Sequence, residues 1–309
     1  MTKKVHDGFV LGSYAPISTI PKYTLSVIHC STCQFAHLKP LPSLNTVQSL
    51  YQSDKFYKSF APPDWLEKEA REHKAGLWNP YYDYQLSLLP QPMTLRPFVT
   101  LLDIGTGAGW FVERARNRKY GYLAYGIEPS EQARNVLKLS TIYPDIASIP
   151  KYLHGFDIVH ASLVLEHLLD PEAALKEWGK LLKPGGKLMV VVPNDFSPLQ
   201  KRALKGGKPC WFISPVHINY FNHLTLGGLL KRCGFSIAYE TATFPMELFL
   251  FLGMNYIGDD KIGRRCHNIR LQFERILKHH AFGLYKKLYN RFGWGRELVF
   301  VTVKTGENK

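Results

Sequence analysis

The sequence of 309 residues contains few cysteines and no long apolar segment. Five cysteines, an odd number in a chain of this length, do not indicate a disulfide framework, so we expect a reducing, cytoplasmic location. The most apolar stretch, residues 244–254, is interrupted by Glu247 and is much shorter than the ~20 residues that span a bilayer. Residues 1–7 also lack the apolar core of a secretory signal. We therefore expect a globular protein that does not cross a membrane.

Acidic residues are scarce at the C-terminal end, although the chain as a whole has an ordinary charged fraction. Residues 201–309 hold 18 Lys and Arg against 7 Asp and Glu, and residues 261–296 hold 10 basic residues against the single acid Glu274. Most of the net charge of +14 is therefore local. A local excess indicates an anionic partner at one face, or else a basic helix face that is simply solvated, and the sequence leaves both interpretations open.

Apolar runs alternate with helical patterns in the middle of the chain, which predicts an α/β fold with a parallel sheet. The predicted strands are residues 99–104, 122–127, 156–160, 187–192, 235–241 and 297–304. The predicted helices are residues 110–119, 130–139, 171–182 and 224–233, and the third of them ends in a Lys-Pro-Gly-Gly turn at 183–186. In residues 1–95 we expect a strand at 23–29 and helices at 46–57 and 64–73. We therefore predict an N-terminal cap over 1–95 and a main domain over 96–309, with a helical insertion at about 244–296.

A glycine cluster between the first predicted strand of the main domain and its helix is the clearest ligand-binding signal. Asp103, Gly105, Gly107 and Gly109 stand there, where glycines let the backbone approach a ligand closely. Their spacing is neither that of the dinucleotide fingerprint nor that of a P-loop. Glu128 ends the next strand, where a carboxylate can accept both hydroxyls of a ribose. The sequence therefore predicts a nucleoside-containing cofactor.

These motifs resemble those of the class I S-adenosylmethionine-dependent methyltransferases, whose first motif reads D-x-G-x-G-x-G. Residues 145–150, 156–160 and 181–186 are similar to three further segments of that family. The resemblance implies a Rossmann-like seven-stranded sheet whose last strand, 297–304, is antiparallel, with S-adenosylmethionine as cofactor. It also implies a role for each cofactor residue: Asp103, Gly105 and Gly107 at the methionine end, Glu128 at the ribose, and Asp145 at the adenine. The other predicted cofactor-binding residues are Gly109, Ile146 and Ser162.

A closer resemblance is to methyltransferases of glycan and natural-product pathways. It rests on Pro193-Asn194, then Trp211, Pro215, His217 and Phe221. It implies O-methylation of a sugar, a glycan-linked group or another small hydroxyl compound. Cys30 and Cys33 also resemble part of the N-terminal zinc ribbon of those enzymes. A tetrahedral zinc site needs four ligands and the chain has one C-x-x-C pair, so we predict no metal and a degenerate ribbon.

His167 and His217 are the predicted catalytic residues. Glu166-His167 lies just beyond the predicted strand 156–160, at the edge of the sheet where ligands bind in α/β proteins. Ubiquinone-pathway O-methyltransferases have E-x-x-E-H at this place, and some hold a divalent ion with it. Here Leu163 replaces the first carboxylate. A hydroxyl acceptor benefits from a base that titrates near neutral pH, which histidine supplies. A purely structural role is the alternative for each histidine.

Two other functions remain as alternatives: an RNA methyltransferase that uses the basic C-terminal segment, and a non-catalytic protein that only binds the cofactor. The amino-methylating enzymes of nucleic acids carry [D/N]-P-P-[Y/F/W] where this chain has residues 160–163. The dipeptide Pro209-Cys210 mimics a cytosine-C5 nucleophile but follows the wrong strand. We therefore do not expect a nucleic-acid partner.

The insertion at about 244–296 has three possible roles. Its aromatic residues could pack over the edge of the sheet, with residues 269–289 as one helix. Alternatively, the insertion covers the acceptor, or it forms a surface that meets acidic lipid or a diphosphate-linked glycan. The expected partners are therefore an acceptor, anionic in some of these interpretations, and a peripheral membrane contact. The sequence predicts no oligomeric state.

Overall fold

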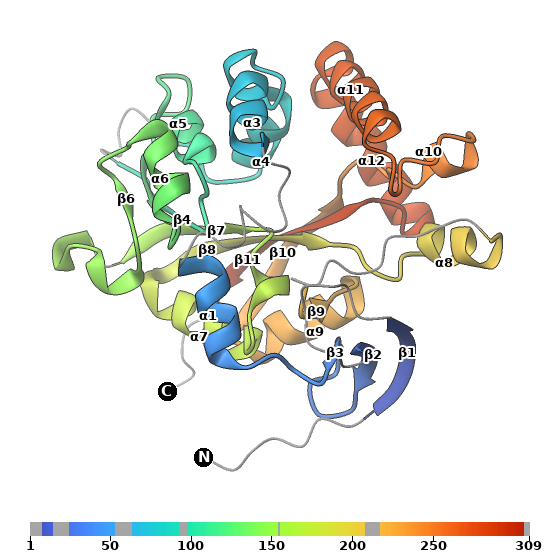
Figure 1. Ribbon diagram of the computed structural model, residues 1–309. Coiled ribbons are helices and arrows are strands. Elements are labelled where there is room, and N and C mark those ends of the chain that lie inside the picture. The colour runs from blue at the N-terminus through green and yellow to red at the C-terminus, as the bar shows by residue number, and fades with distance from the viewer. Residues whose placement is uncertain are drawn as a thin grey trace.

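A seven-stranded sheet forms the centre of the protein and carries helices on both faces (Figure 1). The computed structural model describes residues 8–14, 25–52, 64–92, 98–153, 155–207 and 217–305. The strands of the sheet lie in the order β10-β11-β8-β7-β4-β5-β6. They are β4 (Thr100–Ile104), β5 (Leu123–Ile127), β6 (Ile142–Tyr143), β7 (Phe156–Ser162), β8 (Leu182–Pro193), β10 (Phe235–Ala242) and β11 (Glu297–Lys304).

The strand directions are those of a Rossmann-like methyltransferase sheet. β4 pairs with β5 and β7 in parallel, as do β5 with β6 and β7 with β8. β11 is antiparallel to both of its neighbours, β8 and β10. The predicted fold class, with an antiparallel last strand at 297–304, is therefore confirmed. The two-residue strand β6 was not predicted, because two residues are too few to show a periodic pattern.

The helices divide between the two faces of the sheet (Figure 1). On the upper face in that view lie α3 (Trp65–Lys74), α4 (Asn79–Ser87), α5 (Trp110–Arg116), α6 (Glu131–Leu137), α11 (Asp260–Leu277) and α12 (His279–Phe292), and on the lower face α7 (Pro171–Leu181) and α9 (His223–Arg232). The remaining helices are α1 (Leu44–Gln52), α8 (Pro198–Lys205) and α10 (Leu248–Phe251), with the 3-10 turns η1 (Ile146–Ser148), η2 (Lys151–Leu153) and η3 (Leu165–His167).

Two apolar layers enclose the sheet, because successive residues of each strand point to opposite faces. Leu101 of β4 is fully buried in one cluster with Phe111 of α5. The next residue, Leu102, is fully buried in the other cluster, with Trp178 of α7 and Leu226 of α9. A parallel sheet covered on both faces needs such continuous apolar strands, and this explains why the sequence pattern located them.

A second, four-stranded antiparallel sheet joins the N-terminal region to a later part of the chain. Its order is β1 (Gly8–Tyr14), β2 (Leu25–Cys30), β3 (Ala36–Lys39) and β9 (Asn219–Tyr220). The side-chain amide of Asn219 also donates to the carbonyls of Leu165 (3.2 Å) and Leu168 (2.6 Å). The N-terminal sheet is thus attached to η3 of the main domain. The boundary near residue 95 stays a prediction.

The predicted continuous helix over residues 269–289 is wrong. The chain breaks at Lys278, whose φ of 49° and ψ of −129° end α11, and α12 begins at the next residue. Both helices turn buried faces inward, so each satisfies the same apolar periodicity. A lysine with a positive φ gives no glycine or proline signal at the break, and the pattern therefore read as one helix.

The predicted turn at residues 183–186 lies inside a strand. β8 begins at Leu182, directly after α7, and Gly185 has a φ of 71° within it. Phe156 of β7 pairs with Leu182, whereas Ile158 pairs with Lys187, so β8 contains an irregularity at this point. The Lys-Pro-Gly-Gly sequence is accommodated as a bulge, which bends a strand without ending it.

The N-terminal region contains elements that the sequence did not predict, and two predicted segments lie partly or wholly outside the described residues. β1, β3 and α4 were not predicted; α4 begins at Asn79-Pro80, which resembles a turn although proline is also favoured in the first turn of a helix. Of the predicted helix over 46–57, α1 ends at Gln52 and the rest lies outside the described residues. Residues 208–216, with Pro209, Cys210, Trp211 and Pro215, also lie outside them. Within the described ranges, every helix falls short of the length and apolar content needed to cross a membrane.

Candidate active site

The glycine turn between β4 and α5 has a backbone that only glycine adopts readily. Gly105, Gly107 and Gly109 have φ values of 70°, 57° and 92°. At Gly105 an added Cβ would overlap Cγ2 of Val164, and Gly109 caps the N-terminus of α5. The turn therefore has no side chains between its backbone and a ligand, and it lies at the start of a helix, where backbone N–H groups suit an anionic or polar ligand.

Glu128 holds this turn from the end of β5. One carboxylate oxygen accepts a hydrogen bond from the backbone N–H of Gly107 (2.9 Å), and the other accepts one from Ser130 (2.9 Å). Burial raises the pKa of Glu128, although these two N–H donors favour its charged form. Ser130 in turn caps α6 by accepting from the N–H of Ala133 (3.1 Å). The strand end, the turn and the next helix are thus joined through one carboxylate.

Asp103 and His160 form a buried pair beneath the turn. They are register partners on the parallel strands β4 and β7, and His160 Nδ1 lies 2.7 Å from a carboxylate oxygen of Asp103. The ring of Phe111 stacks on His160 at 4.0 Å between centroids. From the sequence, His160 was predicted only as the end of a strand. Its place at the carboxyl end of the strand next to that of Asp103 is the signal that could have found it.

An open cleft of about 610 Å³ begins at the glycine turn. Four of the predicted cofactor residues line it: Asp103, Gly105, Gly107 and Ser162. Gly109, Glu128, Asp145 and Ile146 are outside its lining, although Glu128 bonds to Gly107. Asp145 is exposed and accepts from the N–H and hydroxyl of Ser148, hydrogen bonds that lower its pKa. The structure thus brings half of the predicted set into one cavity.

Aromatic side chains from helices distant in sequence form the other part of the cleft. The ring of His73 on α3 stacks on Trp110 (4.5 Å) and on Tyr82 of α4 (5.4 Å). The guanidinium of Arg270 on α11 lies over Trp78, 5.2 Å from the ring centroid. All five residues line the same cavity. No short motif connects α3, α4 and α11, so the sequence alone did not predict that these residues meet in one cavity.

Two histidine–glutamate pairs also line this second part of the cleft, the chamber of aromatic and charged side chains. His73 Nε2 lies 3.7 Å from a carboxylate oxygen of Glu69, and His267 Nε2 lies 3.3 Å from one of Glu72. Burial lowers the pKa of His267 to about 4, so this ring is neutral at physiological pH. A carboxylate that orients an imidazole is a common arrangement for proton transfer.

The predicted catalytic histidines lie together, but outside the lining of this cleft. The rings of His167 and His217 are in edge contact, with their centroids 4.9 Å apart. Glu166 lies beside them, with a carboxylate oxygen 3.8 Å from His167 Nε2, and the three residues are close enough to hold a cation. Burial lowers the pKa of His217 to about 3, which makes it a weak base. Burial also raises the pKa of the fully buried Glu166 well above its ordinary value.

The basic segment 261–296 is only partly a surface feature. Arg264, Arg270 and Arg296 line the cleft, and Arg270 is 8% exposed. Arg296 lies 3.5 Å from a carboxylate oxygen of Glu247. Other basic residues of the segment, such as Arg275 and Lys287, are exposed. The basic segment is therefore not uniformly exposed, because Arg270 is buried.

The fold and the site define the class of the protein, which is a Rossmann-like α/β protein that binds a ligand at its strand ends. Its sheet has one antiparallel strand, and a glycine-lined cleft lies at the ends of the parallel strands. A family model described as a methyltransferase domain matches residues 65–240, more than half of the chain, and the chain belongs to this family. S-adenosylmethionine is the cofactor that this membership implies. The bare turn at Gly105 and the carboxylate of Glu128 beside it fit that cofactor.

Characterised relatives include ubiquinone biosynthesis O-methyltransferases. The chain is 32% identical to the enzyme of Coxiella burnetii over 140 residues, which are 42% of this chain and 57% of that one. It is 30% identical to the enzyme of Marinobacter nauticus over 180 residues, 50% of this chain and 74% of that one. The chain thus spans little more than half the length of the Coxiella relative. Among solved structures, the cyclopropane synthase MmaA2 of Mycobacterium tuberculosis matches with a TM-score of 0.49 and 17% identity, over 86% of this chain and 100% of that one.

A matched pair of glycine substitutions tests the cofactor turn. Gly105 and Gly121 both have a φ of 70°, so alanine strains the backbone equally at the two positions. At Gly105 the new Cβ meets Val164, whereas at Gly121 nothing lies within 4 Å. We expect Gly105→Ala to weaken S-adenosylhomocysteine binding at least tenfold in isothermal titration calorimetry and Gly121→Ala to leave it unchanged. Equal affinities would place the cofactor elsewhere.

The burial of Glu166 predicts how stability depends on pH. Within the described part of the chain, neither of its carboxylate oxygens has a hydrogen-bond partner. Because folding raises its pKa, its contribution to stability is fully present below the unfolded value of about 4.3 and is lost as the pH rises toward the folded pKa. We expect Glu166→Gln to have a higher free energy of unfolding than the wild type at pH 8 but not at pH 4, in urea titrations. The exposed Glu177→Gln is the control and should follow the wild type at both values of pH.

Proposed function

We propose that this protein transfers the methyl group of S-adenosylmethionine to a hydroxyl oxygen of a small-molecule or glycan-linked acceptor. One observation carries the proposal: a single cleft runs from the glycine turn to a chamber of aromatic and charged side chains. A new C–O bond forms as the methyl–sulfur bond breaks, and the hydroxyl proton passes to a base. The main contribution of the protein is to hold acceptor and donor in line.

The chamber supports a ring-shaped acceptor that carries negative charge. The rings of Trp78, Tyr81 and Tyr82 line the cavity, and aromatic rings suit sugars and aromatic compounds alike. Arg264, Arg270 and Arg296 line the same cavity, and guanidinium groups suit phosphate and carboxylate partners. The names of the O-methylating relatives from Coxiella burnetii and Marinobacter nauticus support oxygen as the methyl-accepting atom.

For the base we propose His73, whose Nε2 lies 3.3 Å from the hydroxyl of Tyr82 and 3.7 Å from a carboxylate oxygen of Glu69. His73 faces the cleft beside Trp110, the residue that follows the glycine turn. The nearby His267, with its pKa lowered to about 4, is a weak proton acceptor. The pair predicted from sequence, His167 and His217, is the second candidate. It would require the acceptor to approach from outside the described cleft.

Methyl transfer from a labelled donor tests the acceptor class. The purified full-length protein is offered sugar nucleotides, lipid-linked glycans, quinone precursors and tRNA. We expect labelling of a hydroxyl compound in one of the first three classes. Labelled tRNA would instead support the RNA methyltransferase alternative. S-adenosylhomocysteine binding without turnover on any acceptor would support the non-catalytic alternative.

Histidine variants then distinguish the two candidate bases. We expect His73→Gln to lower kcat about 100-fold or more, the usual range for loss of a general base, with S-adenosylhomocysteine affinity unchanged. The exposed His279→Gln is the control. His167→Ala and His217→Ala should keep kcat within a few-fold of the wild type. The opposite pattern would assign the base to His167 or His217.

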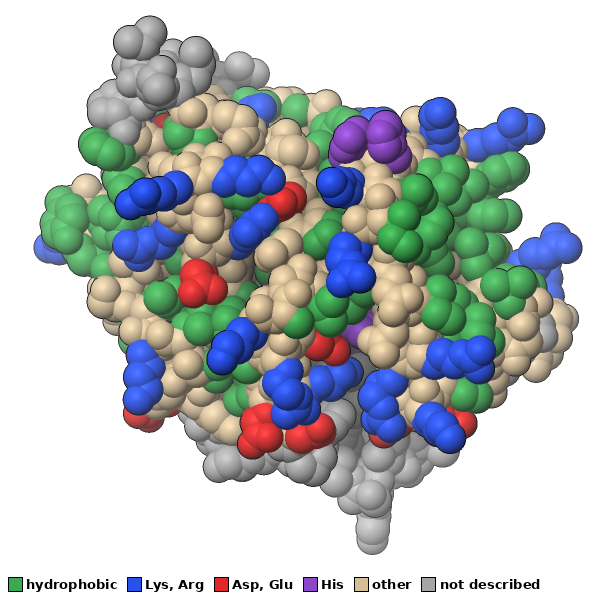
Figure 2. Space-filling model, turned by 90° about the horizontal axis from the view of Figure 1, so that it is seen from above, with side chains coloured by type: hydrophobic (Ala, Val, Ile, Leu, Met, Phe, Trp, Pro, Cys, Tyr) green, Lys and Arg blue, Asp and Glu red, His purple; other side chains and the backbone are tan. Residues whose placement is uncertain are grey.

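A second observation favours contact with a membrane surface, in addition to catalysis. Apolar side chains gather over the C-terminal helices, with Lys and Arg around them (Figure 2). Among the exposed apolar residues of this part of the chain are Leu252, directly after α10 and 72% exposed, and Ile276 of α11, 74% exposed. Basic residues around exposed apolar side chains are typical of peripheral binding to anionic lipid. We propose that α10, α11 and α12 meet an anionic bilayer in this way.

Vesicle sedimentation tests this contact. We expect the protein to pellet with phosphatidylserine-containing vesicles more than with pure phosphatidylcholine vesicles, and less in high salt because the charges are screened. The double variant Leu252→Glu, Ile276→Glu should lose most of this binding. Tyr152→Glu, a change at an 84% exposed residue on η2, is the control. Equal pelleting of both variants would exclude α10–α12 as the contact.

A further inference from the structure

Of the three arginines that line the cleft, Arg270 is the buried one. Arg264 is exposed, and Arg296 lies 3.5 Å from a carboxylate oxygen of Glu247, which compensates part of its charge. Arg270 is 8% exposed, and its Nε has no hydrogen-bond partner among the described residues. A buried guanidinium with an unused donor is costly to keep, and such groups are usually completed by a partner. The cleft is the side from which a ligand can reach this guanidinium.

Glu72 of α3 holds the aromatic ring on which this guanidinium lies. The indole N–H of Trp78 donates to Oε2 of Glu72 (3.0 Å), and this bond orients the indole. The guanidinium of Arg270 lies over the ring, 5.2 Å from its centroid. A cation above an aromatic face is attracted by the ring electrons, and more strongly where water is excluded. Glu72 therefore helps to set the position of Arg270 through Trp78.

His267 of α11 joins the same carboxylate to the guanidinium by a second route. Its Nε2 lies 3.3 Å from Oε2 of Glu72, and its Nδ1 lies 3.5 Å from an Nη of Arg270. Because burial lowers the pKa of His267 to about 4, the ring is neutral and carries one hydrogen. A carboxylate only accepts and a guanidinium only donates. The hydrogen is therefore on Nε2, and the lone pair of Nδ1 accepts a long hydrogen bond from Arg270.

We propose that Arg270 binds an oxyanion of the acceptor, a carboxylate or a phosphate, and that Glu72 positions its guanidinium through Trp78 and His267. The inference rests on the proposed methyl transfer, because it requires the acceptor to lie in this cleft. Guanidinium groups bind both anions through parallel N–H donors, and this geometry depends on the orientation of the guanidinium plane. Glu72 therefore controls the affinity for the anion through Arg270.

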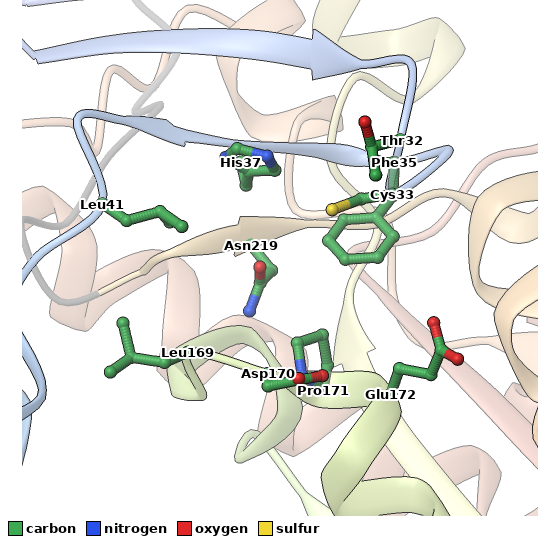
Figure 3. Close-up of a pocket in the computed structure, with 10 residues that line it drawn as sticks. All are labelled: Thr32, Cys33, Phe35, His37, Leu41, Leu169, Asp170, Pro171, Glu172 and Asn219. Carbon is green, nitrogen blue, oxygen red and sulfur yellow. The ribbon is translucent and has the colours of Figure 1, made fainter. Parts of the chain in front are cut away.

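The size of the cleft suits a ring that carries a charged substituent. A smaller cavity, between the N-terminal sheet and the start of α7, measures about 70 Å³ and is lined by residues such as His37, Asp170 and Asn219 (Figure 3). It has room for a few water molecules, each about 30 Å³ in the liquid, and excludes such a ring. The cleft at Arg270 measures about 610 Å³, and sites for small molecules typically measure about 300–1,000 Å³.

Paired probes test the anion site without turnover. Isothermal titration calorimetry of the full-length protein with saturating S-adenosylhomocysteine compares glucose 6-phosphate with glucose, and 3-hydroxybenzoate with 3-hydroxybenzyl alcohol. We expect at least one anion to bind at least tenfold more tightly than its neutral partner, and the pair with the larger difference identifies phosphate or carboxylate. If neither anion is preferred, the proposal is overturned, whether or not any variant folds. A lack of methyl transfer would contradict the proposed function and not this preference.

Arginine variants assign the preference to one guanidinium. We expect Arg270→Met to weaken binding of the preferred anion at least tenfold and to leave its neutral partner and S-adenosylhomocysteine unchanged. Arg275→Met is the matched control, because it removes an exposed charge of the same helix outside the lining of the cleft. Equal losses in the two variants would reflect net charge alone and would overturn the assignment to Arg270.

Variants of Glu72 and His267 test the positioning role. We expect Glu72→Gln to weaken binding of the preferred anion several-fold, whereas Glu67→Gln, an 81% exposed control on the same helix, should not. His267→Asn can still place an acceptor near Arg270 and should bind the anion nearly as the wild type does. His267→Gln directs its amide toward Glu72 and should bind as weakly as Glu72→Gln. A merely structural role would give equal losses for Asn and Gln, and this result would overturn positioning through His267.

Discussion

The parallel pairing of β4 with its two neighbours is the constraint on which the site depends. The register places Asp103 opposite His160 on one side, while Glu128 follows β5 on the other. Because parallel strands end at the same edge, three polar side chains from three segments meet around one glycine turn. The apolar layers on both faces fix that register, since a shift by one residue would reverse every side chain of a strand. Core packing and site geometry are thus set together.

The cleft has two halves that arise in different ways. The half around the glycine turn is built from β4, α5 and the strand ends, all close together in the sheet. The other half comes from α3, α4 and α11, which pack over the upper face although about two hundred residues separate α3 from α11 along the chain (Figure 1). The first half matches what the family shares. The second half carries none of the motifs on which the resemblance rests.

The sequence predicted the elements whose signal is local. Strands such as β11 and the turn at Gly105 carry periodic or motif signals, and the structure has them at nearly the predicted residues. The break at Lys278 had no such signal, because a left-handed lysine is fixed by the packing of α11 and α12 and not by its own preference. His73 and His267 were missed for a related reason: each is ordinary within its helix and acquires a role only through tertiary contact. Local chemistry was predictable, and convergence of distant helices was not.

The pairing of β3 with β9 has a consequence for how the chain acquires its shape. Ala36 is the register partner of Tyr220, so the outer strand of the small sheet is supplied after β4, β5, β7 and β8 have been synthesised. Contacts of such long sequence separation form late, because closing the loop between them costs entropy before it brings any contact. We therefore expect β1, β2 and β3 to form an incomplete sheet first, whose open edge persists until the central sheet presents residues 219–220 to cover it.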